Sequence, residues 1–121
     1  METYRAAIVG LTGIGSGRPS AHPLTATPRS HAAAYLHHPR TDLVAVCDKN
    51  PAALDQFRET WQDVWPDIEY HRDYRVMLES AQPDLLSIAT SDHAHAEIAV
   101  KGALGSPRAI LCEKPIATTL A

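Results

Sequence analysis

The chain has 121 residues, of which 45% are hydrophobic and 21% are charged, and its formal net charge is −3. This length and composition predict a soluble globular chain with one domain over residues 1–121. The acidic balance argues against a nucleic-acid partner, and no apolar run approaches the roughly 20 residues of a membrane span. The N-terminus lacks the basic start of a signal peptide, and Cys47 and Cys112 suggest reduced, buried thiols. We therefore expect a cytoplasmic protein.

A glycine-rich turn follows the first apolar segment, Arg5–Val9, which is typical of a buried parallel strand. Gly10, Gly13, Gly15 and Gly17 come within eight residues. Glycine permits positive φ and a close backbone approach, so a strand, a turn and a helix in this order can hold a phosphate. The spacing departs by one position from the Gly-x-Gly-x-x-Gly pattern of dinucleotide-binding proteins. A flexible loop after a strand is the alternative.

Beyond the turn, the chain alternates between helical and strand-like segments. Proline, serine and threonine mark residues 18–30 as an inserted loop. Helices are expected over His31–Leu36, Pro51–Phe57, Tyr74–Ser80 and Ala94–Leu104, with a further one beginning at Thr118. After the first strand, further strands are expected over Leu43–Cys47, Ile68–Tyr70, Leu85–Ala89 and Ala109–Cys112. This order predicts an α/β fold of the Rossmann type, doubly wound around a mostly parallel sheet.

The carboxyl ends of the predicted strands carry polar residues or glycine. Gly10, Asp48, Thr90 and Glu113 follow four of the strands, and parallel strands bring such positions to one edge of the sheet. In a dinucleotide-binding fold, an acid after the second strand holds the adenosine ribose, and Asp48 has that place. Asp48 lies farther from the glycines than the usual spacing of about 20 residues, which the 18–30 insertion explains. The alternative is an aspartate that only begins a turn.

A short histidine-rich run follows the fourth predicted strand and includes Asp92, His93, His95 and Glu97. It is similar to the His-x-His-x-Asp-His run of metallo-β-lactamase-like hydrolases. A zinc site needs three or four ligands from more than one segment, and no histidine follows His95. We therefore predict no metal site, and keep a metallohydrolase as the third alternative. A helix N-terminus capped by Asp92 or Ser91 is the simpler interpretation.

The run Glu113-Lys114-Pro115 follows an apolar strand directly, with a solvated strand end as the alternative. Together with the other motifs, it makes the chain resemble the N-terminal domain of the Gfo/Idh/MocA oxidoreductases (glucose-fructose oxidoreductase, inositol dehydrogenase and rhizopine catabolism). The matching segments cover nearly the whole chain. They are Gly10–Gly15, His31-Ala32, Leu43–Asp48, Asp73-Tyr74 with Leu78, Ala89-Thr90, His95–Ala99 and Glu113–Pro115.

This resemblance implies a nicotinamide-dependent dehydrogenase or reductase that acts on sugars, polyols or related carbinols, and we expect a homo-oligomer. Lys114 would be the catalytic residue beside the nicotinamide and substrate, and Glu113 would help to place the cofactor ribose. Asp48 favours NAD over NADP because its charge repels a 2′-phosphate, and Lys49 weakens that preference. The resemblance and the strand-end argument together give the expected cofactor-binding residues. They are Gly10, Gly13, Gly15, Asp48, Lys49, Ala89, Thr90, His95, Glu113, Lys114 and Pro115.

The chain departs from the family pattern in three ways. The 18–30 insertion interrupts the phosphate turn, and Ser91 stands where the family commonly has proline. The family's second half, which supplies the substrate pocket and a catalytic Asp/His pair, is absent from these 121 residues. We therefore expect these residues alone to lack turnover. The alternative function is a nucleotide-binding module or fragment with no turnover of its own.

Overall fold

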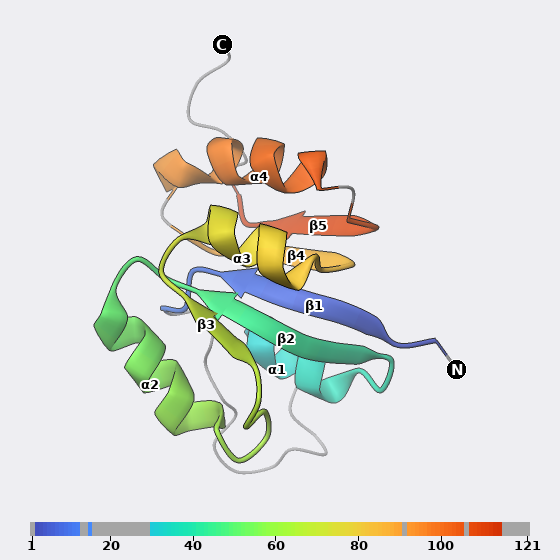
Figure 1. The fold of residues 1–121 in the computed structure, drawn as a ribbon, viewed down its shortest axis with the longest axis vertical. Coiled ribbons are helices and arrows are strands. Elements are labelled where there is room, and N and C mark those ends of the chain that lie inside the picture. Colours follow the sequence, from blue (N-terminus) through green and yellow to red (C-terminus); the bar gives the residue numbers. More distant parts are fainter. Residues whose placement is uncertain (1, 13–14, 16–29, 91, 106, 115–121) are drawn as a thin grey trace.

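The computed structural model describes residues 2–12, 15, 30–90, 92–105 and 107–114. In this part of the chain, five strands form one sheet in the order β3-β2-β1-β4-β5, and every neighbouring pair is parallel (Figure 1). The strands are β1 (Tyr4–Val9), β2 (Thr41–Cys47), β3 (Glu69–His71), β4 (Leu85–Ile88) and β5 (Ala109–Cys112). The predicted α/β, Rossmann-type fold is confirmed. The third strand begins and ends one residue later than the sequence indicated.

Four α-helices connect the strands of the described part. They are α1 (His31–His37), α2 (Pro51–Trp61), α3 (Tyr74–Ala81) and α4 (His95–Leu104), and a short 3-10 helix, η2 (Asp92–Ala94), precedes α4. In these residues no helix is long and apolar enough to cross a membrane. Most of the predicted 18–30 insertion and the predicted helix from Thr118 lie outside the described residues.

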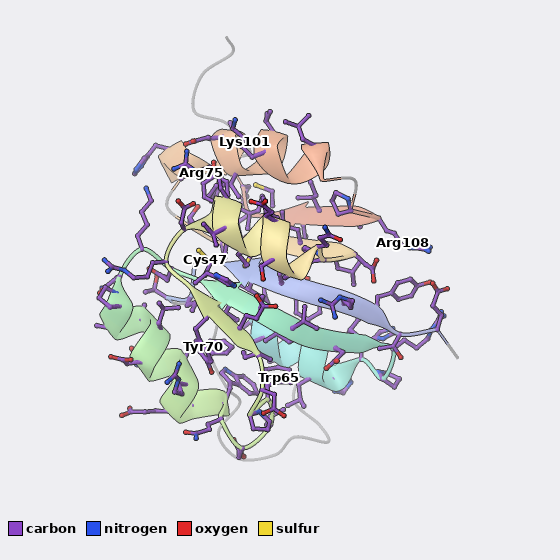
Figure 2. The ribbon with its side chains drawn as sticks, in the orientation of Figure 1. Cys47, Trp65, Tyr70, Arg75, Lys101 and Arg108 are labelled. Atoms are coloured by element: carbon purple, nitrogen blue, oxygen red, sulfur yellow. The ribbon has the colours of Figure 1, made fainter. Side chains whose placement is uncertain are left out.

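The helices cover both faces of the sheet, with α1 and α2 on one face and α3 and α4 on the other (Figure 1). Successive side chains of a strand point to opposite faces, so β1 sends Ala6 and Ile8 into the first core and Ala7 and Val9 into the second. The first core is rich in aromatic rings, and Figure 2 shows two of them, Trp65 and Tyr70. The doubly wound arrangement therefore leaves the carboxyl edge of the sheet as the place where a ligand can reach the strand ends.

Three helices begin at residues whose side chains accept a hydrogen bond from the first helical turn. Ser30 caps α1, Asn50 caps α2 with proline as the next residue, and Asp73 caps α3. Such caps satisfy backbone N–H groups that have no partner within the helix. Asn50 stands three residues after the end of β2 and Asp73 two residues after the end of β3, so they fix where the chain turns away from the carboxyl edge of the sheet.

Candidate cofactor-binding cleft

A cleft of about 500 Å³ opens at the carboxyl ends of β1, β2 and β4, on the side covered by α3 and α4. Its floor comes from the strand ends and its walls from the first turns of the two helices. Figure 2 labels Cys47 and Arg75, which line it from β2 and α3. The charged residues of its lining are Asp48, Lys49, Arg72, Asp73, Arg75 and Glu97.

Gly10 brings the ends of three strands together in the floor of this cleft. Its φ is +96°, and a Cβ there would lie 2.5 Å from the carbonyl carbon of Ala89, so no other residue fits without strain. Its N–H donates to the carbonyl of Cys47 at 2.9 Å. Gly15 also approaches closely, since a Cβ there would overlap the Gly10 carbonyl oxygen. Gly13, predicted with them, lies outside the described residues.

Asp48 fastens the glycine turn to the end of β2. Its Oδ2 accepts a hydrogen bond from the N–H of Leu11 at 3.0 Å, and its Oδ1 accepts one from the N–H of Asn50 at 2.9 Å. A carboxylate offers about four lone-pair positions, so both oxygens keep the capacity to accept a hydroxyl. The side chain is half-buried and lines the cleft, as does the neighbouring Lys49. These remaining acceptor positions, which open to the cleft, fit the hydroxyl groups of a ribose.

A tyrosine joins the two walls of the cleft. The Tyr74 hydroxyl, on α3, donates to Glu97 Oε1, on α4, at 3.0 Å. Burial raises the pKa of Tyr74, and the hydrogen bond to Glu97 raises it further. The sequence interpretation matched Asp73 and Tyr74 to the family pattern but did not place them in the site. The signal was their position, because residues directly after β3 must lie on the same carboxyl edge.

The predicted residues Ala89 and Thr90 lie directly after β4, and His95 is the first residue of α4. Thr90 lines the cleft, and Ala89 is buried beneath it. His95 is only 1% exposed, and its Nε2 lies 2.8 Å from the Thr90 carbonyl oxygen. The structure therefore places His95 behind the loop rather than in the lining of the cleft, which instead includes His93. Within the described part of the chain, no group of three or more His, Cys, Asp or Glu side chains could hold a metal ion.

The predicted residues after β5 lie one strand farther along the edge. The Glu113 N–H donates to the Ile88 carbonyl at 3.0 Å, and Glu113 Oε1 lies 2.8 Å from His31 Nε2. Lys114 is exposed and is not among the residues that line the cleft. Pro115 lies outside the described residues. The structure thus gathers Gly10, Asp48, Lys49 and Thr90 in one cleft, whereas Glu113 and Lys114 lie at the next strand end and outside its lining.

A parallel, doubly wound sheet with a tight glycine turn and an acid after the second strand defines the class of dinucleotide-binding α/β domains. The family model of the Gfo/Idh/MocA proteins, described as "Oxidoreductase family, NAD-binding Rossmann fold", matches residues 4–121. The chain belongs to this family, as the sequence motifs indicated.

Relatives of known name agree with this assignment. An inositol 2-dehydrogenase of Salmonella typhimurium is 33% identical over 84 residues, which is 66% of this chain and 23% of that protein. The WlbA dehydrogenase of Bordetella pertussis, solved with NADH and UDP-GlcNAcA, is 25% identical with a TM-score of 0.74, over 98% of this chain and 30% of that one. A putative dehydrogenase of Bordetella bronchiseptica is 26% identical, also with a TM-score of 0.74, over 98% of this chain and 26% of that one. The chain thus spans about a quarter of the length of its curated relatives.

Proposed function

We propose that this chain is the cofactor-binding part of a dehydrogenase or reductase that moves hydride between a nicotinamide and the carbinol carbon of a sugar, polyol or related compound. The observation that carries the proposal is Asp48, held by two backbone amides at the end of β2 and lining the cleft beside the glycine turn. The named relatives support the substrate class, since one is an inositol dehydrogenase and another was solved with a nucleotide sugar.

In this proposal the cleft at the ends of β1 and β2 takes the adenosine half of the cofactor. Asp48 accepts hydrogen bonds from the ribose hydroxyls, and its charge disfavours the 2′-phosphate of NADP. Lys49 and Arg72 line the same cleft, and their positive charges reduce that preference without removing it. NAD is therefore the preferred cofactor, with NADP accepted more weakly.

The bound nicotinamide would supply the hydride acceptor or donor, and the protein's own residues would handle the proton. We assign that role to Lys114, which follows directly on a residue anchored to β4. An exposed lysine at a strand end can place its amino group against the substrate oxygen. It would give a proton to this oxygen when the carbonyl is reduced and take one from it when the carbinol is oxidised. Glu113 holds the strand end, and its second carboxylate oxygen has capacity for a ribose hydroxyl.

Nicotinamide fluorescence tests the cofactor step. Titration of the protein with NADH and NADPH should give saturable binding for both, with a lower dissociation constant for NADH. Arg72→Ala should weaken NADPH binding more than NADH binding, and Arg108→Ala, on the N-terminal side of β5, is the matched control for loss of one arginine. Absence of binding for both nucleotides would overturn the proposal. Turnover of the full protein on a panel of polyols and sugars then separates an enzyme from a binding module.

We further propose that residues 1–121 form one cofactor-binding domain with residues 18–30 as an insertion, in a cytoplasmic homo-oligomer with no nucleic-acid or membrane partner. Two free cysteines and the net charge of −3 support the location and the absence of a nucleic-acid partner. β5 is an edge strand in which Leu111 is 59% exposed, which supports a further contact there. Light scattering tests the oligomer, and a monomer at high concentration would contradict it.

A further inference from the structure

The first residue of α1, His31, makes a contact that the proposed function does not use. Its side chain is 4% exposed, and its Nε2 lies 2.8 Å from Oε1 of Glu113. The two residues are 82 positions apart in the chain, so only the fold brings them together. Glu113 directly precedes Lys114, the residue to which we assign the proton transfer.

The hydrogen bond fixes which nitrogen of the imidazole ring carries the shared proton. An ionised glutamate can only accept, so the proton of this bond must be on Nε2 of His31. Nδ1 of the same ring is buried and has no hydrogen-bond partner among the described residues. A second proton there would be an unsatisfied buried donor, which costs more than a lone pair in that place. A ring that carries its proton on Nε2, with Glu113 as the acceptor, is the arrangement that this site favours.

The same bond gives the end of β5 a second anchor. In the described part of the chain, β5 is an edge strand whose one paired neighbour is β4, and the Glu113 N–H continues that pairing through the Ile88 carbonyl. The hydrogen bond with His31 holds the Glu113 side chain against the start of α1. Glu113 is thus held through its backbone by β4 and through its side chain by α1, and the direction in which the chain leaves toward Lys114 depends on both contacts.

We infer that His31 is a positioning residue, which clamps Glu113 and thereby orients Lys114 toward the reacting atoms. The inference rests on the proposed function and deepens it. Loss of the His31–Glu113 hydrogen bond should lower the rate more than the cofactor affinity, because this bond lies outside the cleft that takes the adenosine half of the cofactor. A displacement of about 1 Å in a catalytic group can cost up to about 100-fold in rate, so loss of this clamp should be measurable.

The test compares two substitutions of His31 in the full protein. His31→Phe keeps a buried ring and removes the donor, whereas His31→Gln keeps an N–H group that can reach Glu113. We expect His31→Phe to lower kcat by about tenfold to 100-fold and to change the dissociation constant for NADH by less than about threefold. His31→Gln should recover most of kcat.

His71→Phe is the matched control. His71 Nε2 also lies 2.8 Å from a glutamate Oε1, that of Glu69, but on β3 at the far edge of the sheet. This variant should leave kcat within about twofold of the wild-type value, because its pair is remote from Lys114. An unchanged kcat in His31→Phe, or an equal loss in His31→Phe and His31→Gln at normal thermal stability, would overturn the inference.

A spectroscopic readout keeps the inference separate from the proposed function. Imidazole ¹⁵N–¹H spectra of the histidine-labelled protein should show His31 as the Nε2–H tautomer, and Glu113→Ala should remove that preference. A His31 ring protonated on Nδ1 alone would overturn the inference even if the enzyme is active. A wild-type protein that binds no nicotinamide cofactor would instead overturn the proposed function, and the tautomer would still report whether the clamp exists.

Discussion

Two strand ends of this protein carry nearly the same three residues, Cys47-Asp48-Lys49 at the end of β2 and Cys112-Glu113-Lys114 at the end of β5. The sheet places the two cysteines at one level, in a row of register partners that runs from Cys47 through Val9 and Ile88 to Cys112. β2 is an inner strand and β5 is an edge strand. The same types of side chain therefore stand at the same height of the sheet in different surroundings.

The surroundings decide what each acid does. Beside β2 the backbone of the glycine turn is close, and the short side chain of Asp48 accepts from two amides. Beside β5 no further strand is present among the described residues, and the longer Glu113 reaches across to a buried histidine of α1. An acid bonded to backbone amides supports a binding loop, whereas an acid bonded to a side chain couples two elements.

The largest expected effect separates the two lysines. Lys114→Met in the full protein should lower turnover by roughly 100-fold or more, because it removes the proton-transfer group. Lys49→Met should leave kcat nearly unchanged and alter only the relative affinities for NADH and NADPH. Steady-state kinetics with both cofactors measures the difference. Normal turnover in Lys114→Met would remove that lysine from the mechanism.

The two cysteines should differ in reactivity. Burial, and then the negative charges of Asp48 and Asp73, raise the pKa of the Cys47 thiol to about 12. The pKa of Cys112 is also raised, mainly by burial, but this thiol is only partly buried at the edge of the sheet. Because the thiolate is the nucleophile, native alkylation should be clearly slower at Cys47 than at Cys112. Peptide mass mapping after timed treatment with iodoacetamide measures both rates, and equal rates would show that the β2 end opens as readily as the β5 end.

Asp48 gives the next effect in size. Asp48→Ala should weaken NADH binding by about tenfold, because charge-assisted hydrogen bonds are each worth roughly 1.5–3 kcal/mol and part of that is recovered by water. It should also lower the thermal midpoint, since the N–H groups of Leu11 and Asn50 lose their acceptor. Asp48→Asn keeps one acceptor oxygen, so it should lower the thermal midpoint only slightly while it still weakens NADH binding. An unchanged dissociation constant in both variants would place the ribose elsewhere.

The smallest effect comes from a third acid, Glu69, on the opposite edge strand. Hydrogen bonds from His71 and then Ser80 hold the pKa of Glu69 below its ordinary value. A lowered folded-state pKa means that the ionised form stabilises the fold at neutral pH, and that this contribution is lost as the pH falls through the folded pKa. Glu69→Gln should cost less than about 1 kcal/mol at neutral pH. The difference between the two proteins in urea unfolding should shrink below about pH 4, and a constant difference would show that the charge is not involved.

The local sequence was enough to place most elements because the signals were independent of the rest of the fold. Asn50 before Pro51 marks the start of α2, and the apolar segment around Leu43–Cys47 marks a strand that is covered on both faces. The predicted position of the third strand was wrong by one residue, because the strand is only three residues long and half-buried throughout, so its sequence pattern is weak. The expectation that both thiols are buried holds for Cys47, whereas Cys112 is only partly buried because its strand lies at the edge.

What the sequence determined by itself was the order of strands and helices, the family and the acids and lysines at the strand ends. These follow from short-range patterns, in which each residue type reports on its own backbone. Only the tertiary structure decided which groups form hydrogen bonds with one another. Asp48 accepts from the amide of Leu11, Tyr74 donates to Glu97, and His31 bonds to Glu113. Each of these pairs is separated by more than 20 residues and forms only when parallel strands bring their carboxyl ends to one edge, so no local pattern encodes them.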